Sequence, residues 1–510
     1  MSSFTTSDWI IIFFVCQVYT FGYWIRGAIA PITDVLEEEF NGTATQIGLL
    51  SSILYLSYLL FQLPSGLLLQ IYCGEFIVIV SAFGLALSSL AFSYSPTIEL
   101  AIPFHFFNGV FVAPAWIAAV SVASERFGSS NTALSTGIMI FWCKLWIVAL
   151  STFQAMIYEE YGTWRVPFIG LTAILSLIAV LMTLAVMVET KPGAEEEKLR
   201  MDSITELIEQ ELDSFDHFNE GTATAVTAAT NGHHHDNRDR DDRSPLISKE
   251  STPRSRSRCC SIYRADSKDK SFMDRLRKMG RSLSKTLKNP YNYLIGVWGF
   301  CACSVSYALN GLWLVSYLML KYGYSRSLAT FIVGLFYLGM AFGSIICGKI
   351  ANKYKIRKCV IIVGVLLIGI GSCSVIYVLD GDAAMSIVIL MNFVCGFGYG
   401  AIPVSMALIR EYNNQYECSD TATAFCYALQ VGSGFAVQYL IGDLLDYSWE
   451  RRGGDDFVDG GNEREYNVDD YDFAFLTIPA TLGLALVLSF CVRETHGEDI
   501  DDQKYKKHSV

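Results

Sequence analysis

Residues 327–358 read SLATFIVGLFYLGMAFGSIICGKIANKYKIRK, an apolar run that ends in a short segment rich in lysine and arginine. The apolar part, 327–350, is long enough to cross the hydrocarbon core of a bilayer, because roughly 30 Å takes about 20 helical residues. Lysine and arginine gathered at one end of such a run are typical of a helix that ends at the cytosolic face. This stretch therefore predicts a protein that spans a membrane.

Apolar runs of this kind recur in two groups of six, and the polar segment 191–290 separates the groups. Each run has to be helical, because a spanning segment must satisfy its own backbone hydrogen bonds. The expected spans are 9–31, 46–70, 76–94, 99–122, 132–157 and 165–188, then 292–320, 327–350, 359–379, 384–409, 421–446 and 473–492. Two groups of six spans around a hydrophilic linker are the outline of a secondary transporter built from repeats.

We therefore expect an all-α integral membrane fold with twelve transmembrane helices in two pseudo-symmetric six-helix bundles. The first bundle occupies residues 1–190 and the second 291–495. Residues 191–290 read as a cytosolic, largely disordered linker with short amphipathic helices, and 496–510 as a cytosolic tail.

The composition argues against several other classes of protein. Of the 510 residues, 52% are hydrophobic and 17% are charged, whereas soluble domains contain about 25% charged residues. The net charge is -12 and no basic face with interleaved aromatic residues occurs, so we expect no nucleic-acid partner. No nucleophile–base pair or cluster of metal ligands with helical spacing appears, so we expect no enzyme activity, no cofactor and no metal site.

One short run, Gly343–Lys349, imitates a phosphate-binding loop. The next residue is Ile350, where that motif needs the hydroxyl of Ser or Thr for magnesium. We therefore interpret the glycines as sites of close helix packing, and we do not expect an ATP-driven pump.

The distribution of basic residues predicts the sidedness of the chain. The linker and the loop after 327–350 are rich in lysine and arginine, whereas the loops at 33–44, 95–98 and 380–383 contain none. Both termini and the linker are therefore expected in the cytosol. The sequon Asn41-Gly42-Thr43 then falls in the first non-cytosolic loop, which makes Asn41 a candidate for glycosylation.

The two halves carry related sequences in equivalent places. The second span ends Gly66-Leu67-Leu68-Leu69-Gln70, and the eighth ends Gly348-Lys349-Ile350-Ala351-Asn352-Lys353-Tyr354-Lys355-Ile356-Arg357. Tyr55 and Tyr337 each lie eleven residues before the first glycine of these segments, and a Gly-x4-Pro spacing repeats at Gly109 and Gly398.

In their order and spacing these motifs resemble those of the major facilitator superfamily, over both six-span units. The resemblance implies two bundles around a central cavity, alternating access by rocking, and motif loops that close the cytosolic side. The gating residues that it implies are Gly66, Gln70, Gly348, Asn352, Lys353 and Arg357. Gln70 stands where the family motif has Asp and the basic residues that follow are missing, so the first copy of the gate is in doubt.

Charges within the apolar runs are the main functional candidates, because a charge at bilayer depth costs a few kcal/mol or more. Arg26 lies in the first span, Lys144 in the middle of the fifth, and His105 in the fourth. Arg26 is a candidate to bind a carboxylate or a phosphate. The alternative is that its side chain extends to the outer membrane interface. Lys144 is a candidate for anion contact or coupling, and His105 for a pH-dependent role or an ordinary hydrogen-bonded position.

The segment around Arg26 resembles the first helix of the organophosphate:phosphate antiporters and of prokaryotic permeases of the superfamily, where the Arg meets an anion. Asn310 stands where those antiporters have a second Arg, so a two-arginine phosphate clamp is not supported. We expect Tyr23, Asn310 and Gln430 to contribute further contacts with the solute.

The linker carries a candidate sorting signal. Asp242-Arg243-Ser244-Pro245-Leu246-Ile247 matches the acidic dileucine pattern, in which Asp242, Leu246 and Ile247 are the recognised residues. A clathrin adaptor is therefore a possible partner, and the membrane is either endolysosomal or vacuolar, or the plasma membrane. Residues 272–287 predict a basic amphipathic helix that rests on the anionic leaflet or under the bundle.

The sequence therefore predicts a monomeric secondary transporter of a small polar solute that bears an anionic group, with a proton or a counter-anion as a possible coupling ion. Two alternatives remain open. One is a lysosomal or vacuolar exporter of amino acids or small peptides, and the other is a transporter-like receptor or scaffold that moves no solute.

Overall fold

The computed structural model describes residues 6–127, 132–189, 272–413, 418–453 and 464–496. The chain separates into two compact units, one made of 1–183 with 262–510 and the other of 184–261. All helices described below lie in the first unit, except the last turns of α7.

The first half of the chain consists of six long helices that are joined by short connections. These helices are α1 (Thr6–Trp24), α3 (Ala44–Ile71), α4 (Gly74–Ser93), α5 (Ile98–Phe127), α6 (Thr132–Tyr161) and α7 (Arg165–Glu189). Between α1 and α3 lie the 3-10 turn η1 (Ala30–Ile32) and the short helix α2 (Thr33–Phe40). Thr43 and Gln46 form a capping box at the start of α3, which fixes the point where α3 begins.

The second half repeats this plan with more interruptions. Its helices are α10 (Pro290–Ser304), the π-helix η4 (Val305–Trp313), α11 (Leu314–Tyr322), α12 (Arg326–Tyr354), α13 (Arg357–Cys373), the π-helix η5 (Ser374–Val378), α14 (Met385–Tyr399), α15 (Ile402–Asn413), α16 (Ser419–Arg451), α17 (Val468–Ala474) and α18 (Thr477–Cys491). The basic amphipathic helix expected at 272–287 is confirmed as α9 (Phe272–Lys288).

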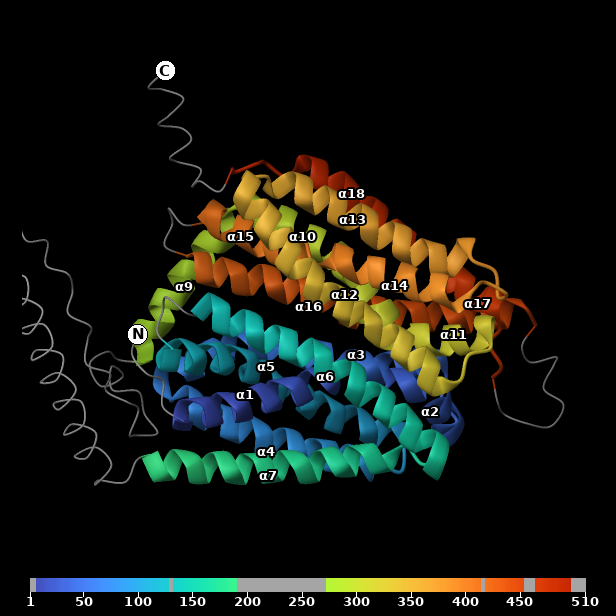
Figure 1. Ribbon diagram of the computed structural model, residues 1–510, viewed down its shortest axis with the longest axis horizontal. Coiled ribbons are helices and arrows are strands. Elements are labelled where there is room, and N and C mark those ends of the chain that lie inside the picture. Colours follow the sequence, from blue (N-terminus) through green and yellow to red (C-terminus); the bar gives the residue numbers. More distant parts are fainter. Residues whose placement is uncertain (1–5, 128–131, 190–271, 414–417, 454–463, 497–510) are drawn as a thin grey trace, which may run out of the picture. The chain divides into compact units, whose positions relative to one another are not determined.

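Eleven helical segments of the described chain are long and apolar enough to cross a membrane. Together with α1 they give the twelve expected helices, and the predicted all-α membrane fold is confirmed. In Figure 1 the blue to teal helices of the first half lie below the yellow to red helices of the second half. The helices α2, α11 and α17 lie at one end, which we call the α2 side, and α9 lies at the other, the α9 side.

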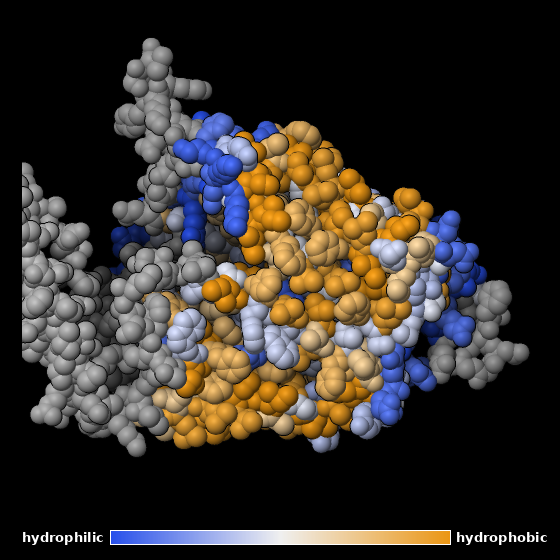
Figure 2. Space-filling model, viewed as in Figure 1, coloured by the Kyte–Doolittle hydropathy of each residue, from blue (hydrophilic) through white to orange (hydrophobic). Residues whose placement is uncertain are grey.

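The surface agrees with this arrangement. Figure 2 shows an apolar belt across the middle of the described helices, with hydrophilic residues gathered toward their ends. Large apolar side chains such as Leu87, Leu177 and Val487 are exposed on this kind of surface, as expected where lipid replaces water.

The two halves meet through small residues at the crossing of α3 and α16. A Cβ atom on Gly442 would lie 2.4 Å from the backbone oxygen of Ala44, which leaves no room for a side chain. The backbones of the two helices therefore approach each other directly on the α2 side. The run Gly343–Lys349 lies inside α12. Gly343 packs against the backbone of Phe397, so close helix packing is confirmed for this glycine, whereas a Cβ atom on Gly348 would meet nothing within 4 Å.

A π-helix interrupts the seventh span, which the sequence predicts as a regular helix. Within η4 the side-chain amide of Asn310 donates a hydrogen bond to the backbone oxygen of Val305 at 3.2 Å. Short π-helical segments inside α-helices are frequent at functional sites. Here the segment places Asn310 and Tyr307 beside the cavity described next.

Candidate solute site

Arg26 lies in the turns that follow α1, where the backbone N–H of Gly27 still bonds to the oxygen of Trp24. Its side chain is buried, with the residue 4% exposed. The guanidinium carbon lies 4.3 Å from the ring centroid of Tyr58 and 5.1 Å from that of Tyr23. Arg26 therefore does not extend to the surface, and aromatic faces surround its charge.

Lys144 on α6 reaches the same aromatic group. It is 2% exposed, and its Nζ lies 3.2 Å from the ring centroid of Tyr23 and 5.3 Å from that of Tyr337. One ring, that of Tyr23, therefore contacts both cations. The structure brings Arg26 and Lys144 together although they lie more than 100 positions apart in the sequence.

Neither cation has a carboxylate partner among the described residues. The ion pairs of this part of the chain involve other arginines, and Arg26 Nε is buried without a hydrogen-bond partner. Burying an uncompensated charge costs several kcal/mol, and tyrosine faces offset only part of that cost. Two cations so placed attract an anionic group more strongly than a neutral one.

A small cavity adjoins these residues between the two halves. Its volume is about 30 Å³, enough for one or two waters and far below the roughly 300 Å³ or more of a typical ligand pocket. Its polar lining residues are Tyr23, Arg26, Tyr55, Ser151, Tyr307, Asn310, Thr330 and Tyr337. The equivalent tyrosines Tyr55 and Tyr337 thus face one cavity, and the helices must separate before an organic solute can enter.

Three predicted site residues, Lys144, Gln430 and His105, do not line this cavity. Lys144 contacts Tyr23 and Tyr337, which do line it. Gln430 on α16 is buried against Gly299, and neither of its side-chain amide atoms has a hydrogen-bond partner among the described residues. His105 on α5 is fully buried at the contact with α4, 5.1 Å from the ring of Phe92, and its Nδ1 lies 3.4 Å from the amide of Asn108. The ordinary interpretation of His105 as a packed helix residue therefore fits its surroundings.

Polar contacts join the two halves on the α2 side. The guanidinium of Arg326, the first residue of α12, donates to both carboxylate oxygens of Asp34 on α2 at 2.6 Å and to the backbone oxygen of Pro31 at 2.6 Å. Asp446 near the end of α16 accepts from the backbone N–H of Thr45 at 2.9 Å. We call the contacts of Arg326 with Asp34 and Pro31, together with the contact of Asp446 with Thr45, the α2-side latch. The latch holds this end of the helices closed.

The latch gives a direct prediction about conformation. Arg326→Gln removes three charge-assisted hydrogen bonds, two to Asp34 and one to the backbone oxygen of Pro31, and such bonds are roughly twice as strong as neutral ones. We expect the fraction of molecules open on the α2 side to rise about tenfold. Arg326 is mostly buried, which strengthens the ion pair, whereas Asp34 is partly exposed, so solvent screens part of the interaction. Cysteine accessibility at Ala44, which is fully buried in the closed form, would report the opening.

The matched control is Arg452→Gln, which also removes an arginine–aspartate pair on the α2 side, but one that lies within the second half, with Asp470. The Arg452→Gln variant should leave the accessibility of a cysteine introduced at Ala44 unchanged. Equal accessibility in the Arg326→Gln variant and the unmodified protein would contradict a role of the latch in closure.

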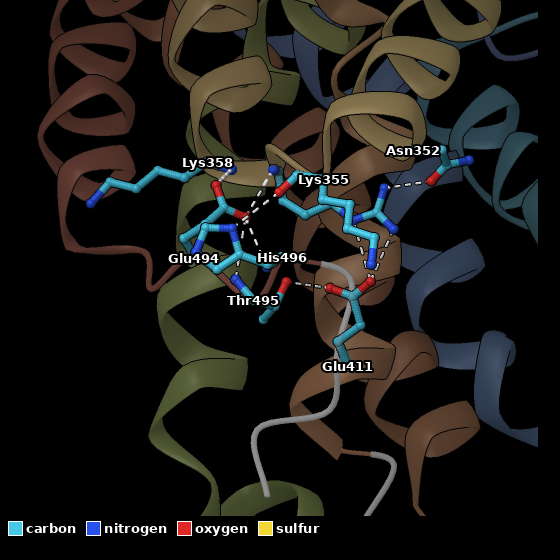
Figure 3. Close-up of polar contacts among 8 residues, drawn as sticks. Asn352, Lys355, Lys358, Glu411, Glu494, Thr495 and His496 are labelled. Atoms are coloured by element: carbon cyan, nitrogen blue, oxygen red, sulfur yellow. Dashed lines mark hydrogen bonds and ion pairs between the residues drawn. The ribbon is translucent and has the colours of Figure 1, made fainter. Parts of the chain in front are cut away.

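The second copy of the predicted gating motif forms an ion cluster on the α9 side (Figure 3). Arg357 at the start of α13 donates to Glu411 Oε1 on α15 at 3.0 and 3.2 Å and to Asn352 Oδ1 at 2.7 Å. The motif residues Asn352 and Arg357 therefore contact each other. Lys353 is exposed and lies over the ring of Tyr354, outside this cluster.

Glu494 completes the cluster at the beginning of α13. Its two oxygens accept the backbone N–H groups of Arg357 and Lys358 at 2.9 and 2.8 Å, which suits a carboxylate at a helix N-terminus. All these contacts lie within the second half, so the cluster orders α13, α15 and the chain after α18 relative to one another.

The first half has an ion cluster in a similar place with the charges exchanged. Arg126 at the end of α5 pairs with Glu75 at the start of α4 and with Asp8 of α1, each at 3.1 Å. In the second half the acid, Glu411, lies on α15 in the place of the end of α5. The arginine, Arg357, lies at the start of α13 in the place of the start of α4. Gly66, from the degenerate first motif, has open space beside it, and the structure does not describe the side chain of Gln70.

Several functional candidates were not apparent from the sequence. Tyr58 resembles any other aromatic residue in a span, although it lies closest to Arg26. Asp34 and Arg326 lie in short polar connections, where charges are ordinary. Only the spacing of Tyr55 and Tyr58 along the predicted second span could have indicated a polar face on that helix.

The remaining predicted sites differ in what the structure says of them. Asn41 is exposed and ends α2 with a left-handed backbone conformation, φ 48°, on the α2 side. The sorting candidates Asp242, Leu246 and Ile247 lie outside the described residues. Within the described ranges no group of three metal-ligating side chains is found.

Two groups of six helices with a cavity between them are the arrangement that the sequence motifs imply. The family model of the Major Facilitator Superfamily matches residues 12–437 and 295–497, and the chain belongs to this family. The resemblance of the sequence motifs is thereby confirmed.

Two curated relatives match parts of the chain. An uncharacterized MFS-type transporter of Methanocaldococcus jannaschii is 28% identical over 137 residues, which cover 25% of this chain and 36% of the relative. The uncharacterized transporter YybO of Bacillus subtilis is 25% identical over 172 residues, 34% of this chain and 39% of the relative. The matched regions thus span little more than a third of these relatives.

Solved structures share the fold along nearly the whole chain. A bacterial homologue of the human lysosomal transporter Spinster, in an inward-facing and occupied conformation, superposes with a TM-score of 0.65 at 12% identity, covering 96% of this chain and 97% of that one. The nucleoside transporter NupG superposes with a TM-score of 0.61 at 11% identity, covering 94% and 98%. At such identities the likeness concerns the fold.

Proposed function

We propose that this member of the superfamily carries a small polar organic solute with an anionic group by alternating access. The observation that supports the proposal most strongly is the pair of buried cations, Arg26 and Lys144, that share the ring of Tyr23 beside the inter-half cavity. A neutral solute would leave both charges buried without compensation. An anionic group would replace the weaker cation–π contacts with charge-assisted hydrogen bonds.

The roles of the residues follow from their placement. Arg26 offers a planar fork of donors that matches a carboxylate or a phosphate, and Lys144 adds a second positive charge. Asn310 and Tyr307 in η4 offer neutral hydrogen-bonding groups from the opposite half. A solute that contacts both halves at once draws them together, which is how binding energy promotes the conformational change.

The closed latch indicates the direction in which the cavity opens. We infer that the α9 side is cytosolic, because the exposed stripe of α9 carries Arg277, Arg281, Lys285 and Lys288 and the motif loop beside α12 is also basic. Closure on the α2 side then leaves access from the cytosol. The exposed Asn41 would then lie on the non-cytosolic side of the membrane, where glycosylation takes place.

Coupling must use groups other than a carboxylate in the cavity, since none of its lining residues is acidic. Lys144 is the candidate for protonation-linked transport, because loss of its proton in a buried site would remove one of two neighbouring positive charges. Exchange against a counter-anion would use the same two cations. Amino acids and small peptides also bear a carboxylate, so an endolysosomal exporter of such solutes fits the same site.

The test is uptake by purified protein in proteoliposomes, with a pool of labelled carboxylates, phosphates, amino acids and dipeptides. We expect flux of anion-bearing solutes only. Lys144→Met, which keeps the length of the side chain without its charge, should lower this flux at least tenfold, whereas Lys349→Gln at the exposed end of α12 should not change it.

The outcomes distinguish the candidates. Flux restricted to amino acids or dipeptides would select the exporter, and flux of other organic anions would select the broader carrier. Flux of neutral solutes alone would contradict the anion site. Absence of flux under every gradient, with folded protein, would favour the receptor-like alternative.

A further inference from the structure

An acidic side chain without a cationic partner lies beside the α2-side latch. Glu37 is on α2, one helical turn after Asp34, and its Oε1 is buried and has no hydrogen-bond partner among the described residues. The neighbouring carboxyls are arranged differently. Asp34 holds Arg326, and Glu39 pairs with Arg165.

Glu37 also lies within electrostatic range of the second half. Asp446 at the end of α16 is close enough to repel it, and Asp446 itself accepts hydrogen bonds from Tyr466 at 2.5 Å and from Arg464 at 3.0 Å. Tyr471 of α17 is a further titratable neighbour. The cations of this region, Arg326 and Arg464, are thus engaged by the two other carboxylates.

We propose that Glu37 is a proton-binding site through which the compartment on the α2 side controls closure of the latch. A buried carboxyl with like charges on both sides is stable only when it carries a proton. When the halves separate on the α2 side, water reaches Glu37 and the proton can leave. This proposal concerns closure and does not depend on which solute is carried.

The direction of the pH dependence follows from the two states. Burial and the charges of Asp34 and Asp446 raise the pKa of the Glu37 carboxyl to about 8 in the closed form, whereas a hydrated glutamate has a pKa of about 4.3. A raised carboxyl pKa means that the closed form binds the proton more tightly. Closure is therefore fully favoured below the ordinary pKa of glutamate, and this advantage is lost as the pH rises toward about 8.

The thermodynamic linkage between proton binding and closure limits the size of this pH effect. Between these two pKa values the ratio of closed to open molecules changes by at most about tenfold per pH unit. An acidic compartment on the α2 side, such as an endolysosomal lumen, would hold the latch closed and keep the cavity directed to the cytosol.

The experiment is a distance measurement by pulsed electron spin resonance on full-length protein in nanodiscs. Spin labels are placed at Thr97→Cys in the first half and Asp382→Cys in the second, both exposed on the α2 side, in a background whose label-accessible native cysteines are replaced. The closed population should grow as the pH falls from about 8 toward the ordinary pKa of glutamate.

Three variants make the result specific to Glu37. Glu37→Gln and Glu37→Leu are both neutral, and each should remain closed with no pH dependence over this range. Glu38→Gln removes the same charge from the next, exposed position and should retain the response of the unmodified protein. Infrared spectroscopy at neutral pH should show a protonated carboxyl band that the Glu37→Gln variant lacks.

A closed population that does not change with pH in the unmodified protein would overturn the proposal. So would an unchanged pH response in both Glu37 variants, because another group would then bind the proton. If one variant fails to fold, the other variant and the infrared band of the unmodified protein still decide the question.

Discussion

Arg26→Gln should abolish transport of the anionic solute, lowering kcat/KM by roughly 100-fold or more. Truncating one member of a buried charge pair typically costs about 2–5 kcal/mol, and about 1.4 kcal/mol corresponds to a factor of ten. Arg26 is nearly fully buried and lines the cavity, so solvent cannot replace it as a partner for the solute. The measurement is initial uptake in proteoliposomes at matched protein density.

One further variant separates charge from geometry at this position, and a second variant elsewhere is the control. Arg26→Lys keeps the positive charge but loses the planar fork, so it should restore part of the transport. Lys349→Gln removes a charge from the exposed end of α12 and should transport normally. Full activity of folded Arg26→Gln protein would show that Arg26 is structural.

Gly396→Ala should destabilise the protein by several kcal/mol, the largest effect on folding that we predict for an alanine substitution. A Cβ atom at Gly396 in α14 would lie 2.0 Å from the backbone oxygen of Phe336 in α12. Backbone at that distance cannot rotate away, so the two helices would have to separate. Overpacking that moves backbone typically costs about 1–3 kcal/mol and sometimes more.

The control is Gly483→Ala in α18, where a Cβ atom meets nothing within 4 Å. Alanine is better than glycine in a helix by roughly 0.5–1 kcal/mol, so this variant should be at least as stable as the unmodified protein. Thermal unfolding of both proteins in the same detergent measures the difference. An unchanged Tm for Gly396→Ala would contradict the close contact of α12 and α14.

The sequence was sufficient to predict the helices but insufficient to predict their contacts. Hydropathy and length identify the spans because the bilayer imposes both, and the expected twelve helices are present. The π-helix around Asn310 was not predicted, because its extra residue per turn leaves no periodic signal in a uniformly apolar run. Similarly, Gly396 is recognisable as a glycine in a helix, but nothing in the sequence shows which helix approaches it.

The candidate site shows the same division. Arg26 and Lys144 were predicted because a charge in an apolar run is costly, whatever its neighbours are. Their common contact, Tyr23, could not be predicted, because it depends on how α1 and α6 are placed. His105 met the same criterion, yet it lies between α4 and α5 beside Asn108. Depth in the membrane therefore identifies candidates, and only the fold shows which of them face the cavity.

The latch residues Asp34 and Arg326, and also Glu37, were not identified from the sequence, because they lie outside the apolar runs. Asp34, Glu37 and Arg326 lie in connections where charged residues are expected, so their types carry no signal. Their proposed roles come from contacts between the two halves, which the sequence does not reveal.

The most direct test of the anion site is a comparison of matched solutes, each a carboxylate and its amide of nearly the same size, in uptake by the same proteoliposomes. The account predicts that the carboxylate is transported and the amide is not, and that Arg26→Gln with Lys144→Met abolishes the difference between them. Equal transport of the amide and the carboxylate by the unmodified protein would contradict the proposal that these two cations select an anion.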